Sequence, residues 1–172
     1  MGHSEGTMHS ANVPLDYRGS VRVNASAPRV FSHLDDQVAL AKHMTRRSLM
    51  MGGGRMTYSY DDRKGQAEGS VIRMGGSAFG IHLSVEEIVT ERVPPIRKRW
   101  RTTGSPRMLI LESYEMGFDI VPMEKDSLVS VWISYVPKWQ RGVRGRIATA
   151  LSAHYARWCV QRMLDDAQRV AA

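Results

Sequence analysis

The side chains of this sequence that could carry acid–base chemistry are few and lie far apart along the chain. Such chemistry needs a histidine, a carboxylate or a tyrosine inside an otherwise apolar cavity. His154 falls at the edge of the apolar stripe of a C-terminal helical segment, although a packed histidine is the simpler interpretation; His82 shares a strand face with small residues and should contact solvent. Glu112 and Lys98 fall on strand faces with aromatic side chains, where an unpaired charge is costly to bury. We expect each of these two to lie near an open end of the fold or to serve a function.

A second group of residues could bind an apolar ligand. Tyrosines that face an apolar interior can orient a ligand oxygen, and methionines, of which the chain has 11, adapt to irregular apolar shapes. Plain core packing uses the same residue types, so both interpretations stay open. The candidate ligand-binding residues, chosen by strand parity and helical spacing, are Met56, Tyr58, Trp100, Tyr114, Met116, Phe118, Leu151, His154, Tyr155 and Trp158.

Other kinds of site have little support. A single cysteine, Cys159, excludes an internal disulfide and a multi-cysteine metal site, and the chain has no His-Glu-x-x-His motif. The glycine run at 52–54 lacks the Lys-Ser/Thr pair of a phosphate-binding loop. We therefore predict no metal and no cofactor, and no catalytic residue is assigned.

The formal net charge of +7 raises the question of an anionic partner. The basic residues gather in two segments: Arg97, Lys98, Arg99 and Arg101 in one, and Arg141, Arg144 and Arg146 in the other. A solvated basic face is the simpler interpretation. The alternatives are a polyanion on the strand face of Arg97, Arg99 and Arg101, or peripheral contact with an anionic membrane. We do not expect nucleic acid as a partner.

The elements that position these residues begin with a strand and a helical break. Residues 17–24 alternate as a strand, and Ser26 with Pro28 predicts a helix start. A second short helix is expected over residues 36–43. Residues 55–136 then show a period of two, broken by short turns into six segments, which implies antiparallel neighbours.

One long helix closes the chain. It is predicted from about residue 145 to residue 170, with Ile147, Leu151, Tyr155 and Trp158 on one apolar face. The whole order predicts an α+β helix-grip fold: a seven-stranded antiparallel curved sheet around a long C-terminal helix, with two short helices after the first strand. Such an architecture usually encloses a cavity.

The length of 172 residues predicts one domain over residues 17–172, preceded by a flexible polar arm, residues 1–16. No apolar run is long enough to span a membrane, and the N-terminus lacks the apolar core of a secretory signal, so the cytoplasm is the default location. The sequence does not determine an oligomeric state.

This order of elements resembles the START-like superfamily, also called SRPBCC, the polyketide cyclase/dehydrase and lipid-transport group. The resemblance covers roughly residues 17–170 and rests on three segments, "VRVNASAPRVFSHLDD", "TERVPPIRKRW" and "GFDIVPMEKDSLVSVWISYVP". It implies an apolar cavity between sheet and helix. Members of the group bind lipids, hormones, polyketides or quinones, and some catalyse cyclisation or dehydration. The three segments are largely structural, so they imply a pocket and no set of catalytic residues.

Three hypotheses follow. The first is a protein that binds a hydrophobic small molecule (a lipid, polyketide or quinone-like compound) between the sheet and the last helix. The second is a cyclase or dehydratase that uses the same cavity. The third is a polyanion-binding or protein-interaction module that uses the basic strand face.

Overall fold

The computed structural model describes residues 12–38 and 56–171, and all structural statements below concern these residues, without the side chains of Met56 and Ala78. The strands are β1 (Leu15–Val23), β2 (Met56–Tyr60), β3 (Val71–Ala78), β4 (Ile81–Val93), β5 (Arg97–Arg107), β6 (Leu111–Pro122) and β7 (Ser127–Pro137). The helices are α1 (Ala27–Asp35), α3 (Gly142–Gln168) and the short 3-10 helix η2 (Arg169–Ala171).

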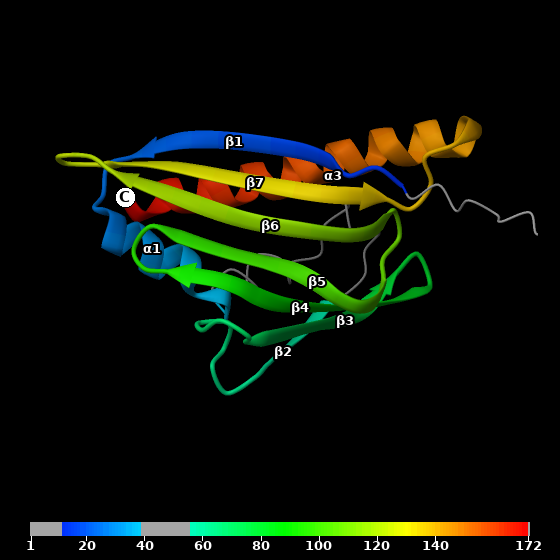
Figure 1. Ribbon diagram of the computed structural model, residues 1–172, viewed down its shortest axis with the longest axis horizontal. Helices are drawn as coiled ribbons and strands as arrows, with labels where there is room; N and C mark the ends of the chain where they lie inside the picture. Colours follow the sequence, from blue (N-terminus) through cyan, green and yellow to red (C-terminus); the bar gives the residue numbers. More distant parts are fainter. Residues whose placement is uncertain (1–11, 39–55, 172) are drawn as a thin grey trace, which may run out of the picture.

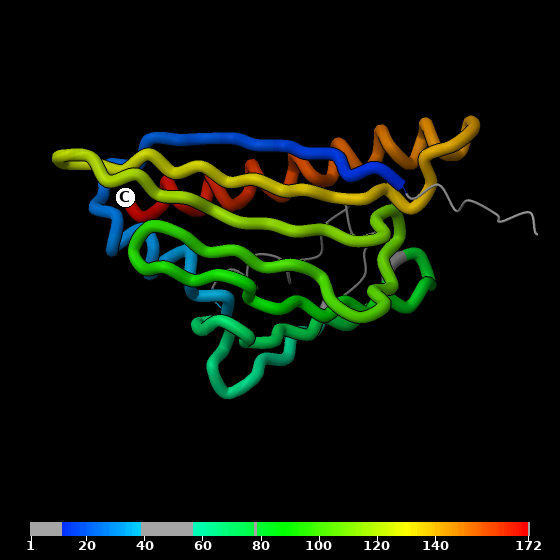
Figure 2. The backbone as a smooth tube through the Cα atoms, in the orientation of Figure 1, coloured from blue at the N-terminus to red at the C-terminus, as the bar shows by residue number. Residues whose placement is uncertain are grey.

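The strands form one antiparallel sheet in the order β1-β7-β6-β5-β4-β3-β2. The six later strands therefore follow each other as hairpins, and β1 returns to pair with β7. Helix α3 runs along β1 and β7, and α1 lies at the end of the sheet where the chain ends (Figures 1 and 2). The predicted helix-grip fold with seven antiparallel strands is confirmed.

Two boundary predictions concern segments that are only partly described. The second short helix expected over 36–43 lies outside the described residues from position 39 onward. The predicted polar arm lies outside them up to residue 11, and β1 begins at Leu15, inside the range given to the arm.

The core forms where the concave face of the sheet meets α1 and α3. Strand parity turns Met116, Phe118 and Ile120 of β6 inward, because side chains alternate between the two faces of a strand. Phe31 of α1 contacts the ring of Phe118 edge to face, with 5.6 Å between the centroids. Trp100 of β5 also meets the ring of Phe118 edge to face, with 6.3 Å between the centroids.

Helix α3 buries a different face from the predicted one. Ile147 is 57% exposed and Leu151 52% exposed, so the prediction that both belong to the buried stripe was wrong. The buried residues of α3 are Gly145, Ala148, Ser152, Ala156, Val160, Leu164, Asp166 and Ala167. Many of them are small, and they let the helix approach the sheet closely. At Gly19 of β1 a Cβ atom would lie 2.8 Å from Cδ1 of Leu164.

No helix in the described part of the chain is long and apolar enough to cross a membrane.

Candidate functional site

Glu87 is a buried carboxyl on the inner face of the sheet. It follows Leu83 and Val85 in the inward register of β4 and is 6% exposed. Burial raises its pKa to about 7, although the hydrogen bond from Tyr114, the charge of Lys98 and the indole of Trp100 each lower it. A carboxyl with a pKa near 7 can both accept and donate a proton at neutral pH.

Tyr114 of β6 holds this carboxyl in place. Its hydroxyl donates a hydrogen bond to Oε1 of Glu87. The Oγ1 of Thr102 on β5 in turn accepts from the backbone N–H of Tyr114 at 3.2 Å and donates to its carbonyl at 3.3 Å. Burial and the neighbouring charge of Glu87 raise the pKa of Tyr114 well above its ordinary value, so the phenol stays protonated. At neutral pH the hydroxyl of Tyr114 is therefore a permanent hydrogen-bond donor, and the carboxyl of Glu87 beside it carries an exchangeable proton.

A buried ion pair lies next to the Glu87–Tyr114 pair. The Nζ of Lys98, which is fully buried, lies 2.7 Å from Oδ1 of Asp35 at the end of α1. Arg92 donates to Oδ2 of the same carboxylate at 2.8 Å. Burial alone would raise the pKa of Asp35, but the hydrogen bonds and charges of Arg92 and Lys98 outweigh it and hold that pKa below its ordinary value. Because each charge has a partner, this cluster fastens α1 to the sheet while its lysine acts on Glu87 through space.

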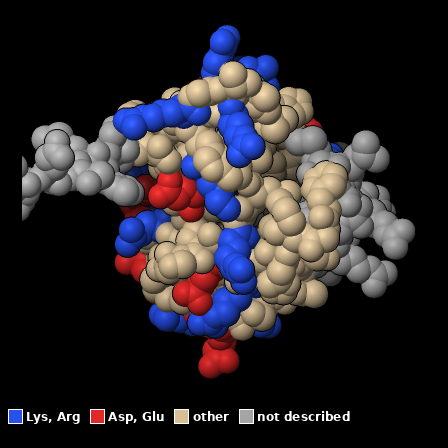
Figure 3. Space-filling view, turned by 90° about the vertical axis from the view of Figure 1, so that its right-hand side faces the viewer, with Lys and Arg blue, Asp and Glu red and all other residues tan. Residues whose placement is uncertain are grey.

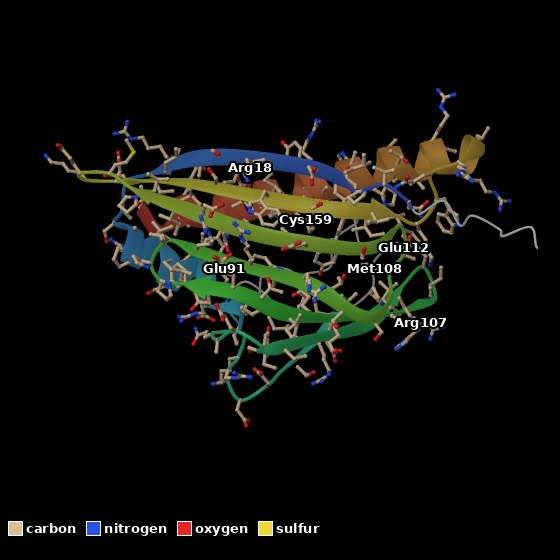
Figure 4. The ribbon with its side chains drawn as sticks, viewed as in Figure 1. Arg18, Glu91, Arg107, Met108, Glu112 and Cys159 are labelled. Carbon is tan, nitrogen blue, oxygen red and sulfur yellow. The ribbon has the colours of Figure 1, made fainter. Side chains whose placement is uncertain are left out.

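Helix α3 contributes Tyr155 and Cys159 to the same interior. Burial raises the pKa of Cys159 to about 12, despite a hydrogen bond with Tyr155, so its thiol is protonated and a poor nucleophile. The nearby thiol and burial raise the pKa of Tyr155 well above its ordinary value. Figure 4 shows Cys159 near the middle of α3.

Tyr58 belongs to β2, the strand at the opposite edge of the sheet from β1, and lies near enough to Glu87 to feel its charge. Burial, and then the charge of Glu87, raise its pKa. Its hydroxyl is buried and has no hydrogen-bond partner among the described residues. An unpaired buried hydroxyl is costly, and a ligand oxygen could satisfy it.

Comparisons with known proteins identify the fold. No family model and no curated protein sequence matches the chain. Among solved structures, norcoclaurine synthase from Thalictrum flavum, in complex with dopamine and hydroxybenzaldehyde, matches with a TM-score of 0.65 and 16% identity over 99% of this chain and 94% of that one. The di-domain ARO/CYC BexL from the BE-7585A biosynthetic pathway matches with a TM-score of 0.65 and 17% identity over 94% of this chain and 51% of that one. Protein CV1439 from Chromobacterium violaceum matches with a TM-score of 0.59 and 18% identity, covering 91% and 96%.

The chain has the START-like, or SRPBCC, fold. Identities this low establish the fold alone, so the residues of the site must carry the functional argument.

Within this START-like fold, several predicted ligand-binding residues come together. Tyr114 and Trp100 each lower the pKa of Glu87, and the charge of Glu87 contributes to the raised pKa values of Tyr58 and Tyr155, so all four lie near this carboxyl. Their role in binding stays a prediction.

The other predicted residues lie elsewhere. Met116 and Phe118 are buried in the core, and Trp158 is half-buried and stacks on Tyr155 with 5.9 Å between the rings. Leu151 and His154 are exposed on α3. The side chain of Met56 lies outside the described part of the chain.

Of the two candidate charges, Glu112 lies at an open end of the sheet, which was one of its two predicted alternatives, whereas Lys98 is fully buried. Lys98 is paired with Asp35, as shown above. A bulge between Leu111 and Ser113 shifts the register of β6, so Glu112 is exposed at the end of the sheet, where it accepts a hydrogen bond from Asn12 at 3.0 Å (Figure 4). Glu112 is thus not an interior acid–base group.

Glu87 was not among the site residues predicted from the sequence. The available signal was its parity, because a carboxylate two residues after Val85 on an otherwise apolar strand face must point inward. The pairing of Asp35 with Lys98 had no local signal, since the two residues are 63 positions apart.

The basic strand face is largely neutralised. Arg97 pairs with Asp119 at 2.6 Å, and Arg99 pairs with Glu91 at 3.0 Å and covers the ring of Trp132. Arg97, Arg99 and Arg101 do share the outer face of β5, but carboxylates of the neighbouring strands pair with two of them, and binding of a polyanion there stays a prediction.

Proposed function

We propose that the protein binds an apolar small molecule that carries oxygen atoms, in the interior between the sheet and α3, and that Glu87 transfers a proton to or from it. One observation carries the proposal: the buried Glu87 carboxyl, with its pKa raised to about 7 and a permanent donor, Tyr114, beside it. A carrier of a neutral lipid gains nothing from a carboxyl that is costly to bury. An acid–base enzyme needs one.

Each side chain has a defined part in the proposed proton transfer. Ionised Glu87 takes a proton from the carbon next to a ligand carbonyl, and the electron pair left behind moves onto the carbonyl oxygen, which becomes an enolate. The hydroxyl of Tyr58, which lacks a partner among the described residues, donates to that oxygen and stabilises its negative charge. The neutral Glu87 then returns the proton at another atom. The charge of Lys98 favours ionised Glu87 before the step.

Two structural neighbours support an enzyme over a carrier. One is a synthase that was solved with a phenolic amine and an aromatic aldehyde, and the other is an ARO/CYC protein of a biosynthetic pathway. We therefore place the substrate among aromatic or polyketide-like carbonyl compounds, and cyclisation or dehydration among the reactions.

Native mass spectrometry of protein purified from its own host, before and after denaturation, tests the binding half of the proposal. A small apolar molecule that is released on denaturation supports it and gives the chemical class of the ligand. If related carbonyl compounds are then converted, Glu87→Gln should abolish conversion and leave binding intact. Full turnover by Glu87→Gln would exclude Glu87 as the acid–base group, and Glu86→Gln, on the opposite face of the same strand, is the matched control.

A further inference from the structure

One end of the molecule carries large apolar side chains in solvent. Phe79 is 72% exposed and Ile81 55% exposed at the β3–β4 hairpin, and Val143 is 74% exposed and Trp139 50% exposed where β7 leads into α3. Figure 1 shows the hairpin and the first turns of α3 at the same end of the long axis, and these turns project beyond the sheet. Exposed apolar groups gathered on one part of a protein mark an interaction surface.

The backbone at Phe79 strengthens this interpretation. Phe79 has a φ of 52° and Gly80 a φ of 75°, the left-handed conformation of a tight hairpin turn. Asn and Gly are the favoured residues in such turns, and a large side chain there is strained. The fold gains nothing in return, because the phenyl ring is exposed. A contact outside the protein would explain why an aromatic residue occupies the tip.

Basic side chains lie at the same end of the molecule as these apolar residues. The exposed ones at this end are Arg107, Lys138, Arg141, Arg144 and Arg146. A view straight onto this end shows a band of Lys and Arg side chains between uncharged surface, with acidic side chains to one side (Figure 3). Arg107 is labelled beside the β3–β4 hairpin in Figure 4.

We infer that this end docks on an anionic lipid surface. Phe79, Trp139 and Val143 enter the boundary between headgroups and acyl chains, and the arginines contact lipid phosphates. A second copy fits less well, since docking two such ends would bring like charges together. A nucleic acid backbone would leave the apolar tips without a partner. This surface is distinct from Glu87, so the inference does not depend on the proposed function.

Co-sedimentation of the full chain with vesicles tests the inference. We expect binding to vesicles of phosphatidylglycerol and phosphatidylcholine in equal parts, none to phosphatidylcholine alone, and loss of binding as salt increases. Phe79→Asn should lower the partition coefficient about tenfold, because it removes a large apolar side chain from the bilayer boundary. The same change places a turn-favoured residue at the tip, so it should not damage folding. The charge reversal Arg141→Glu should lower the coefficient at least about fivefold.

The opposite end of the molecule supplies matched controls. Met123→Asn alters an exposed apolar residue of the β6–β7 hairpin, and Arg29→Glu reverses an exposed charge on α1, both at the other end of the long axis (Figure 1). Both variants should bind anionic vesicles as the unaltered protein does. Failure of the unaltered protein to bind, or equal losses in the controls, would overturn the inference. A dimer that Phe79→Asn dissociates, without vesicle binding, would assign the surface to a second copy instead.

Discussion

Replacement of Glu87 by glutamine should change how the stability of the protein depends on pH. The folded protein has a Glu87 pKa of about 7, whereas the ordinary value is 4.5. Because the folded state holds this proton more tightly, protonated Glu87 favours folding below about pH 4.5. That contribution is lost as the pH rises through about 7. A difference of about 2.5 pH units corresponds to about 3 kcal/mol of unfolding free energy.

Urea unfolding between about pH 5 and about pH 8 measures this effect. Glutamine has the shape of the protonated carboxyl and does not titrate. The free energy of unfolding of the unaltered protein, minus that of Glu87→Gln, should therefore fall by roughly 2–3 kcal/mol across this interval. Other titrating groups cancel in the difference. The control Glu86→Gln removes a carboxylate that pairs with Arg73 at the surface, and its difference should stay within about 1 kcal/mol. Parallel curves for the unaltered protein and Glu87→Gln would refute the assignment of a raised pKa.

Three further predictions follow from the same cluster. Tyr114→Phe removes the hydrogen bond that lowers the pKa of Glu87, so NMR titration of the Glu87 carboxyl should show a midpoint higher by roughly 1–2 pH units. An unchanged midpoint would show that Tyr114 does not influence the pKa of Glu87. Lys98→Met leaves the buried carboxylate of Asp35 with one partner fewer and should lower the free energy of unfolding by about 3–5 kcal/mol. The second substitution Asp35→Asn, added to Lys98→Met, should restore part of this loss. A loss under about 1 kcal/mol would contradict the buried ion pair. Cys159, with its pKa raised to about 12, should react with a thiol reagent far more slowly in the folded protein than in denaturant at the same pH, and equal rates would show an accessible thiolate.

The fold could be predicted from the sequence because its signals are local. Period-two segments, short turns and one long closing helix each depend on neighbouring residues, and together they gave the number of strands and their antiparallel pairing. The alternation of β5, with Lys98, Trp100 and Thr102 inward, follows the same rule.

The site was harder to predict because its contacts are distant in sequence or break the local rule. Arg97 meets Asp119 across 22 positions, so no local pattern could show that this arginine of the basic strand face is paired. The bulge in β6 moved Glu112 outward, and no period-two pattern contains a bulge. On α3 the helical spacing of large apolar residues predicted the wrong buried face. The helix instead buries small residues such as Ala148, Ser152 and Ala156 and leaves Leu151 outside.

The measurement that tests the central claim most directly is an NMR titration of carboxyl-labelled glutamate, with the Glu87 signal assigned by its absence in Glu87→Gln. The account predicts that this carboxyl titrates with a midpoint near 7 in the folded protein and that a bound apolar ligand shifts the signal. A midpoint near the ordinary value of 4.5 would contradict it, because Glu87 would then be a permanent carboxylate with no proton to exchange at neutral pH.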